Sequence, residues 1–228
     1  MKPIIKTILI LTLFAIAMGF LETAVVVYLR ALYYPNGFDF PMVETSNLVL
    51  KTELLREFAT LIMLLTIGIL VGKNFAQRFV FFLYSFAIWD LFYYIFLKYL
   101  LNWPASFFTW DILFLLPMPW YGPVLAPCII SISMIFFTFL IIHLQQKNIV
   151  IKFNRFDWLM MICASLIFIA SFTSEFIRWF ISGNHTINTM GFEFIPQHYN
   201  WYVFAIAQIL LLTDFVWIYK RHKSNLNY

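Results

Sequence analysis

Residues 7–29 have the sequence TILILTLFAIAMGFLETAVVVYL, an apolar run interrupted by one charged residue, Glu22. At about 1.5 Å per residue, a helix of this length crosses the roughly 30 Å hydrocarbon core of a bilayer. The basic start of the chain and its Ala15-x-Ala17 pattern are also typical of a secretory signal peptide. Because the apolar run continues well past Ala17, we predict an uncleaved membrane-spanning helix.

Five further apolar segments of similar length follow the first. The predicted spans are about 7–29, 53–72, 78–100, 123–143, 157–180 and 200–219. The composition agrees, since 63% of the residues are hydrophobic and 11% are charged, whereas soluble domains are roughly half apolar and a quarter charged. The sequence therefore predicts an all-α polytopic membrane protein of six helices. No polar stretch is long enough for a separate soluble domain, so we expect residues 1–228 to form a single transmembrane domain.

Basic residues predict the orientation of the spans. They precede the first span, occupy the second and fourth connections and follow the last span: Lys2, Lys6, Lys73, Arg78, Lys147, Lys152, Arg155, Lys220, Arg221 and Lys223. Because cytoplasmic loops are enriched in Lys and Arg, we expect both termini to be cytoplasmic and the protein to reside in the inner (plasma) membrane. These helix ends account for the net charge of +4, so a lipid bilayer is the expected partner and nucleic acid is not.

The third connection is unusual. Residues 102–123 have the sequence NWPASFFTWDILFLLPMPWYGP, in which an apolar centre at 105–116 lies between Pro104 and the pair Pro117 and Pro119. Twelve residues are too few to span a bilayer, so we predict a re-entrant or interfacial helix. Such a segment either lines a cavity or covers the bundle as a rigid lid, and the sequence does not decide between the two.

Three carboxylates lie deep in the predicted spans. Glu22 follows Lys6 by sixteen residues and Glu57 precedes Lys73 by sixteen, which puts both about 24 Å from the cytoplasmic ends of their helices. Asp90 lies nearer the middle of the third span. Charges in hydrocarbon are costly and usually face a bundle interior, a partner or a water-filled cavity. Their shared depth predicts a polar site in the outer half of the membrane.

We therefore expect a polar pocket that opens toward the extracytoplasmic side. Its predicted ligand-binding residues are Glu22, Arg30, Arg56, Glu57 and Asp90, with Asp111 of the third connection closing it. The expected contacts are Glu22–Arg56 or Glu57–Arg30 ion pairs, and a tyrosine hydroxyl on the Asp90 carboxylate. The network has a purely structural alternative, in which these pairs only fix the register of the helices. Other charges, Glu53 among them, are explained as helix ends that reach the headgroups.

Several kinds of chemistry are not expected. Glu53-x-x-x-Glu57 lacks the Glu-x-x-His step of carboxylate di-metal bundles, so no metal is predicted. The histidines, including His185, fall at helix ends or in connections, which argues against an intramembrane haem, and no other cofactor is indicated. The two cysteines lie in apolar runs and are interpreted as small hydrophobic residues. Nucleophile elbows and HExxH helices do not occur in the sequence.

Three functions remain. The first is the binding or transport of a small polar or amphiphilic ligand, and the presence of both charge signs suggests a zwitterion, a lipid headgroup or proton coupling. The second is a membrane-embedded enzyme that acts on a lipid-linked substrate, with Glu or Asp as acid and base. The third is a non-catalytic subunit or assembly factor. The sequence leaves open whether the partner is a second copy of the chain or another membrane protein.

Overall fold

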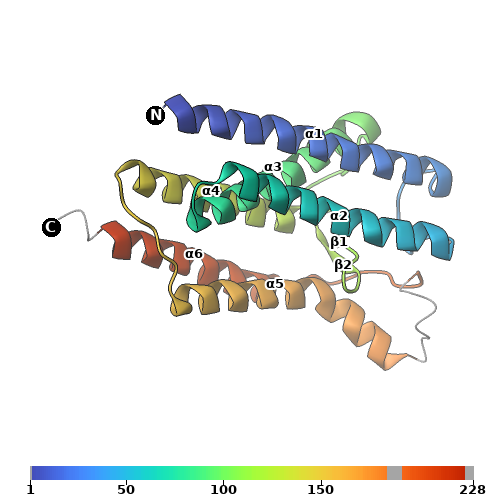
Figure 1. Cartoon of the computed structure of the whole chain (residues 1–228). Helices are drawn as coiled ribbons and strands as arrows, with labels where there is room; N and C mark the ends of the chain where they lie inside the picture. Colours follow the sequence, from blue (N-terminus) through green and yellow to red (C-terminus); the bar gives the residue numbers. More distant parts are fainter. Residues whose placement is uncertain (1, 184–191, 224–228) are drawn as a thin grey trace.

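The structure, a computed structural model, describes residues 2–183 and 192–223. Its helices are α1 (Lys2–Tyr33), α2 (Asn47–Val71), α3 (Phe75–Leu101), α4 (Leu125–Gln146), α5 (Arg155–Ser182) and α6 (Trp201–Lys223), with strands β1 (Trp110–Phe114) and β2 (Trp120–Pro123) between α3 and α4. Within the described residues, six helices are long and apolar enough to cross a membrane. They lie side by side as a bundle (Figure 1). The predicted all-α polytopic membrane fold is therefore confirmed.

Side-chain caps fix where several helices begin. Ser46 accepts a hydrogen bond from the Val49 amide at 3.3 Å, and the Asn74 side chain accepts one from the Gln77 amide at 3.0 Å. At the start of α5, Asn154 forms a reciprocal capping box with its N3 residue. These caps satisfy amides that have no acceptor within the helix.

The predicted re-entrant or interfacial helix at 105–116 is wrong. The segment instead forms a β-hairpin in which β1 pairs antiparallel with β2, with a register irregularity between Ile112 and Phe114. A short apolar run fits either a strand or a helix, and the β-branched and aromatic side chains here favour a strand. A hairpin alone is only marginally stable, and this one packs on α5, where Trp120 stacks on Phe172 with ring centroids 6.0 Å apart.

Helix α3 is the centre of one half of the bundle, since α1, α2 and α4 all pack against it. By contrast, α1 contacts α2 only slightly. The approach of α1 to α3 depends on Gly19, where an added Cβ would lie 2.9 Å from the Trp89 carbonyl oxygen. In the other half α5 packs on α6, and the hairpin lies between α2 and α5 (Figure 1). The hairpin thus connects the two halves of the bundle.

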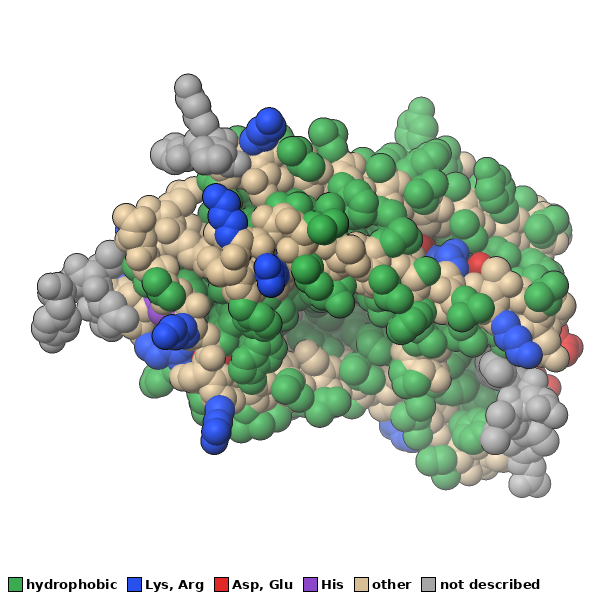
Figure 2. Space-filling view, viewed as in Figure 1, with side chains coloured by type: hydrophobic (Ala, Val, Ile, Leu, Met, Phe, Trp, Pro, Cys, Tyr) green, Lys and Arg blue, Asp and Glu red, His purple; other side chains and the backbone are tan. Residues whose placement is uncertain are grey.

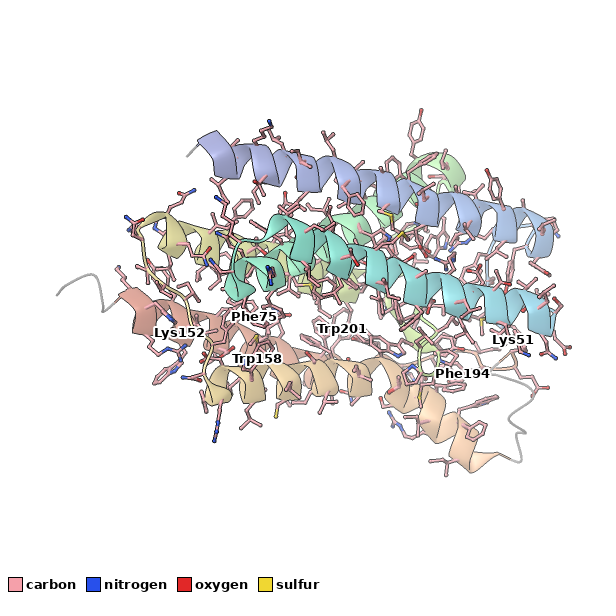
Figure 3. All side chains as sticks on the ribbon, viewed as in Figure 1. Lys51, Phe75, Lys152, Trp158, Phe194 and Trp201 are labelled. Atoms are coloured by element: carbon pink, nitrogen blue, oxygen red, sulfur yellow. The ribbon has the colours of Figure 1, made fainter. Side chains whose placement is uncertain are left out.

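The two ends of the bundle differ in charge. Helix α1 begins and α6 ends at the same end (Figure 1), and most of the visible Lys and Arg side chains gather there (Figure 2). Lys152 lies at this end and Lys51 at the opposite one (Figure 3). Between the ends, the visible surface is largely hydrophobic (Figure 2). A bilayer is the environment that such a surface requires.

Candidate ligand-binding site

One cavity of about 290 Å³ lies in the half of the bundle opposite the basic end. All six sequence-predicted site residues are among its lining residues: Glu22, Arg30, Arg56, Glu57, Asp90 and Asp111. They come from α1, α2, α3 and β1, which are far apart in the sequence. The remaining walls include the connection between α1 and α2 and the turn of the hairpin. Residues that the sequence placed at one depth thus surround a common space.

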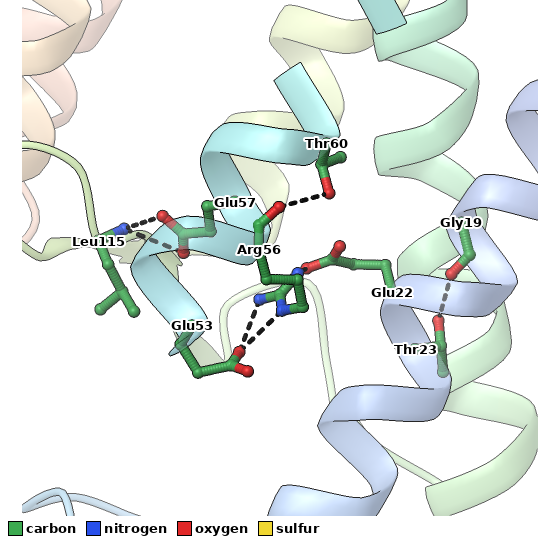
Figure 4. A network of polar contacts seen from close by, with 8 residues as sticks. All are labelled: Gly19, Glu22, Thr23, Glu53, Arg56, Glu57, Thr60 and Leu115. Atoms are coloured by element: carbon green, nitrogen blue, oxygen red, sulfur yellow. Dashed lines mark hydrogen bonds and ion pairs between the residues drawn. The ribbon is translucent and has the colours of Figure 1, made fainter. Parts of the chain in front are cut away.

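Arg56 is the centre of the first cluster (Figure 4). Its Nη1 forms an ion pair with Glu22 of α1, and its Nε and Nη2 lie 2.9 and 2.8 Å from Oε2 of Glu53. The expected Glu22–Arg56 pair is confirmed. Glu53 was interpreted as an ordinary helix end, although its three-residue spacing from Arg56 is a signal for this contact. One guanidinium therefore faces two carboxylates.

Glu57 contacts the hairpin and not Arg30. Its two carboxylate oxygens accept a hydrogen bond from the Leu115 amide, at 3.2 and 3.0 Å (Figure 4). The expected Glu57–Arg30 pair is wrong. The Leu115 amide follows the end of β1, beyond the last residue that pairs with β2, so it has no acceptor from the ladder. Glu57 supplies one and attaches α2 to the hairpin.

Arg30 lies between two aromatic rings in the second cluster. Its guanidinium carbon is 3.8 Å from the Trp103 ring centroid and 4.5 Å from that of Phe38. One of its nitrogens, Nη2, lies 3.8 Å from Oδ1 of Asp111. Such stacking on ring faces stabilises a guanidinium that has little contact with water. Arg30 is thus held by rings and by one carboxyl group.

Asp111 is the most deeply buried of the six residues, with 3% of its surface exposed. Tyr94 donates a hydrogen bond to its Oδ2 at 3.2 Å. Burial disfavours the charged form and raises the pKa of Asp111 to about 6, although Arg30 and the hydrogen bonds oppose this shift. Its charge therefore changes within the range of pH that cells encounter.

Asp90 contacts a hydroxyl from another helix. Ser131 of α4 donates a hydrogen bond to Oδ2 of Asp90 at 2.8 Å. The expected tyrosine partner is wrong, because Tyr94 contacts Asp111 instead. Among the described residues, no hydrogen bond to Oδ1 of Asp90 is formed. Within the described residues, Asp90 thus contacts one hydroxyl group and forms no ion pair with a guanidinium.

The lining carries more acidic than basic groups. It includes five carboxyl groups, because Glu53 joins the two Asp and two Glu residues that were predicted, and two guanidinium groups. Both guanidinium groups already contact carboxylates. The rest of the lining is mainly apolar and aromatic, with Tyr33, Phe38, Trp89, Tyr93, Phe114 and Phe192 among its members. The indole N–H of Trp89 is buried and has no hydrogen-bond partner within the described residues.

Metal ligation has no geometric basis in the described part of the chain, where no three His, Cys, Asp or Glu side chains are arranged to hold an ion. His185 lies outside the described residues.

The fold and the cavity define a multi-pass integral membrane protein with charged residues around an internal space. Comparison with protein-family models, curated proteins and solved structures gives no match to this chain.

Proposed function

We propose that this membrane protein binds a small polar or amphiphilic ligand in the charged cavity. The observation that carries the proposal is the convergence of seven charged residues from four elements on one space of about 290 Å³. Ion pairs that only fixed helix register would need no such space between them. The volume is near the lower end of the range of ligand sites, about 300–1,000 Å³, and a few polar groups among apolar walls are typical of such sites.

We further propose that the cavity opens toward the extracytoplasmic side of an inner membrane, with both termini cytoplasmic and the whole chain acting as one transmembrane domain. The distribution of basic side chains supports this orientation, because they gather at the end opposite the cavity (Figure 2). The connection between α1 and α2 contributes Tyr34, Phe38, Met42, Val43 and Thr45 to the wall. A ligand from the outer side would therefore meet this connection first.

A thermal-shift screen tests the proposal. The purified chain is heated with ethanolamine, choline, betaine and glycerol phosphate, which are fragments of zwitterionic and lipid headgroups, and the same screen is repeated with Asp90→Asn. We expect at least one fragment to raise the Tm of the wild type and to have little effect on the variant, because Asp90 has an oxygen that accepts no hydrogen bond from the described residues. The Ser131→Ala variant, which removes the hydroxyl partner but no charge, is the matched control.

Two results would contradict ligand binding at this site. Either no fragment shifts the Tm of a well-folded wild type, or the shift is unchanged in Asp90→Asn. Transport requires a further experiment, in which uptake of the stabilising fragment into liposomes is measured with wild type and with Asp90→Asn. Uptake that is equal in both would exclude transport through this cavity.

Asp111 favours a second candidate, an enzyme that acts on a lipid-linked substrate. A buried carboxyl whose pKa is raised to about 6 accepts or donates a proton near neutral pH, as acid–base catalysis requires. The test is the turnover of membrane lipid extracts by the purified protein, followed by mass spectrometry. Turnover that persists in a folded Asp111→Asn variant would remove this carboxyl from consideration.

A further inference from the structure

A second hollow lies beside the charged cavity and is mainly apolar, with Thr173, Ser174 and Arg178 as its polar lining residues. It has a volume of about 560 Å³ and is lined by the hairpin turn and by residues of α5 between Leu166 and Arg178. The surface is hollowed between α2 and α5 and is bordered there by hydrophobic side chains (Figure 2). We name this hollow the α5 groove. An apolar concave surface on a membrane-spanning helix is suited to a hydrocarbon chain.

The hairpin turn belongs to both spaces. Pro117 and Met118 line the charged cavity and the α5 groove alike. The two hollows therefore adjoin at the turn. This arrangement provides adjoining places for a polar group and a chain that are parts of one molecule.

The charge of the cavity indicates the sign of the polar group. Carboxyl groups outnumber guanidinium groups five to two in the lining, and both guanidinium groups already contact carboxylates. Among the described residues that line the charged cavity, an anionic group would find no unengaged cation and several repelling oxygens, whereas a cation would meet attraction from most of the wall. The aromatic walls add a second, independent preference, because ring faces attract ammonium groups.

We propose that the ligand is a lipid of the surrounding bilayer whose head group carries an ammonium ion. The ammonium lies among the cavity carboxylates, Asp90 included, and a hydrocarbon chain passes the hairpin turn and lies in the α5 groove. This inference rests on the proposed function, since it names the class of ligand for the same cavity. It also explains why an apolar groove adjoins a cavity that is lined by charges.

The experiment separates head from chain with three probes and uses the full chain in detergent. Dioleoyl phosphatidylethanolamine supplies both parts, dioleoyl phosphatidylglycerol has the same chains without the ammonium, and glycerophosphoethanolamine has the head without chains. Lipid retention is counted by native mass spectrometry, and affinity is measured by thermal shift. We expect the wild type to retain phosphatidylethanolamine and to bind phosphatidylglycerol at least about tenfold more weakly, because a buried charge contact is lost.

Substitutions distinguish the two parts of the site. Ala170 is exposed and lines the groove, so Ala170→Trp fills it at little cost in stability, and Ile177→Trp is a second such variant. Both should lose retention of phosphatidylethanolamine about tenfold and still bind glycerophosphoethanolamine as the wild type does. Ile162→Trp, on the same helix outside the groove, is the matched control. Asp90→Asn should weaken binding of both ammonium probes.

The outcomes separate this inference from the proposed function. Equal retention of the two lipids would overturn the ammonium assignment, and unchanged retention in both groove variants would overturn the chain assignment. In either case the proposed function would still hold if glycerophosphoethanolamine bound to the wild type and not to Asp90→Asn. If the folded wild type bound none of the three probes, both the lipid assignment and the proposed function would be contradicted.

Discussion

The contact between Glu57 and the hairpin gives the sharpest test of how the structure is held together. Both oxygens of this carboxylate accept from the Leu115 amide, at 3.2 and 3.0 Å, and the side chain is buried. A glutamine keeps one acceptor oxygen at the same reach, whereas an alanine removes every acceptor. Glu57→Gln and Glu57→Ala therefore differ in whether the Leu115 amide remains bonded.

The expected losses follow from the chemistry of the bond. A hydrogen bond to a charged group is worth about 1.5–3 kcal/mol and a neutral one about 0.5–1.5 kcal/mol. Glu57→Gln should therefore cost about 1 kcal/mol. The neutral glutamine side chain offsets part of this cost, because no charge has to be buried. Glu57→Ala leaves a partly buried N–H without an acceptor and should cost about 2–3 kcal/mol. For a chain of this size the respective falls in Tm are about 3 and about 8 °C.

The assay is thermal unfolding in detergent, followed by the loss of the monodisperse peak in size-exclusion chromatography. Glu44→Ala is the control, because Glu44 is an exposed acidic residue of the connection between α1 and α2 and should leave the Tm unchanged. Equal falls for the glutamine and alanine variants would refute the reasoning, since the charge and not the acceptor would then matter. No fall in either would show that the hairpin is held by its aromatic contacts alone.

Three further predictions follow from other contacts. Because burial raises the pKa of Asp111 from 3.8 to about 6, its contribution to stability is present below pH 4 and is lost as the pH rises through 6. The free energy of unfolding of the wild type should therefore fall by about 3 kcal/mol over this range relative to Asp111→Asn, seen as a falling Tm, and a constant difference between the two would contradict this. Gly19→Leu should destabilise the bundle by about 1–3 kcal/mol, because the added Cβ meets the Trp89 carbonyl oxygen at 2.9 Å. A melting curve like that of the wild type would show instead that α1 moves away from α3 without cost. At the basic end, Arg221 donates to both oxygens of the fully buried Asp157 at 2.7 and 2.5 Å. Because the Arg221 side chain is 28% exposed and Asp157 keeps the Asn154 amide as a donor, Arg221→Ala should cost about 1.5–3 kcal/mol, and an unchanged Tm would contradict this.

Hydropathy was enough to predict the spans, and counting along the helices was enough to predict which charges lie around one space. Glu22 and Glu57 were placed at one level by counting residues from Lys6 and Lys73, and both line the same cavity. Depth depends only on the rise along a helix, which is the same for every sequence. That these residues bind a ligand stays a prediction.

Partners were harder to predict than positions. The choice between Tyr94 and Ser131 for Asp90 depends on how α3 and α4 are rotated against each other, which one sequence does not specify. The hairpin was missed because the twelve mainly apolar residues between the prolines have no periodicity that separates a strand from a buried helix. The partner of Glu57 was missed with it, since the Leu115 amide is a free donor only if β1 ends where it does.

The Glu22–Arg56 pair has a consequence for how the protein is made. Its members are 34 residues apart on consecutive helices, whereas the main packing surface of α1 is on α3, which is synthesised later. Insertion scales put the cost of a charged residue at a helix centre at about 2.5–3.5 kcal/mol, and Glu22, in the outer half of its span, carries part of that cost. Until α2 follows, Glu22 has no cation beside it at this depth. The ion pair is thus a contact that α1 and α2 can form before α3 is synthesised.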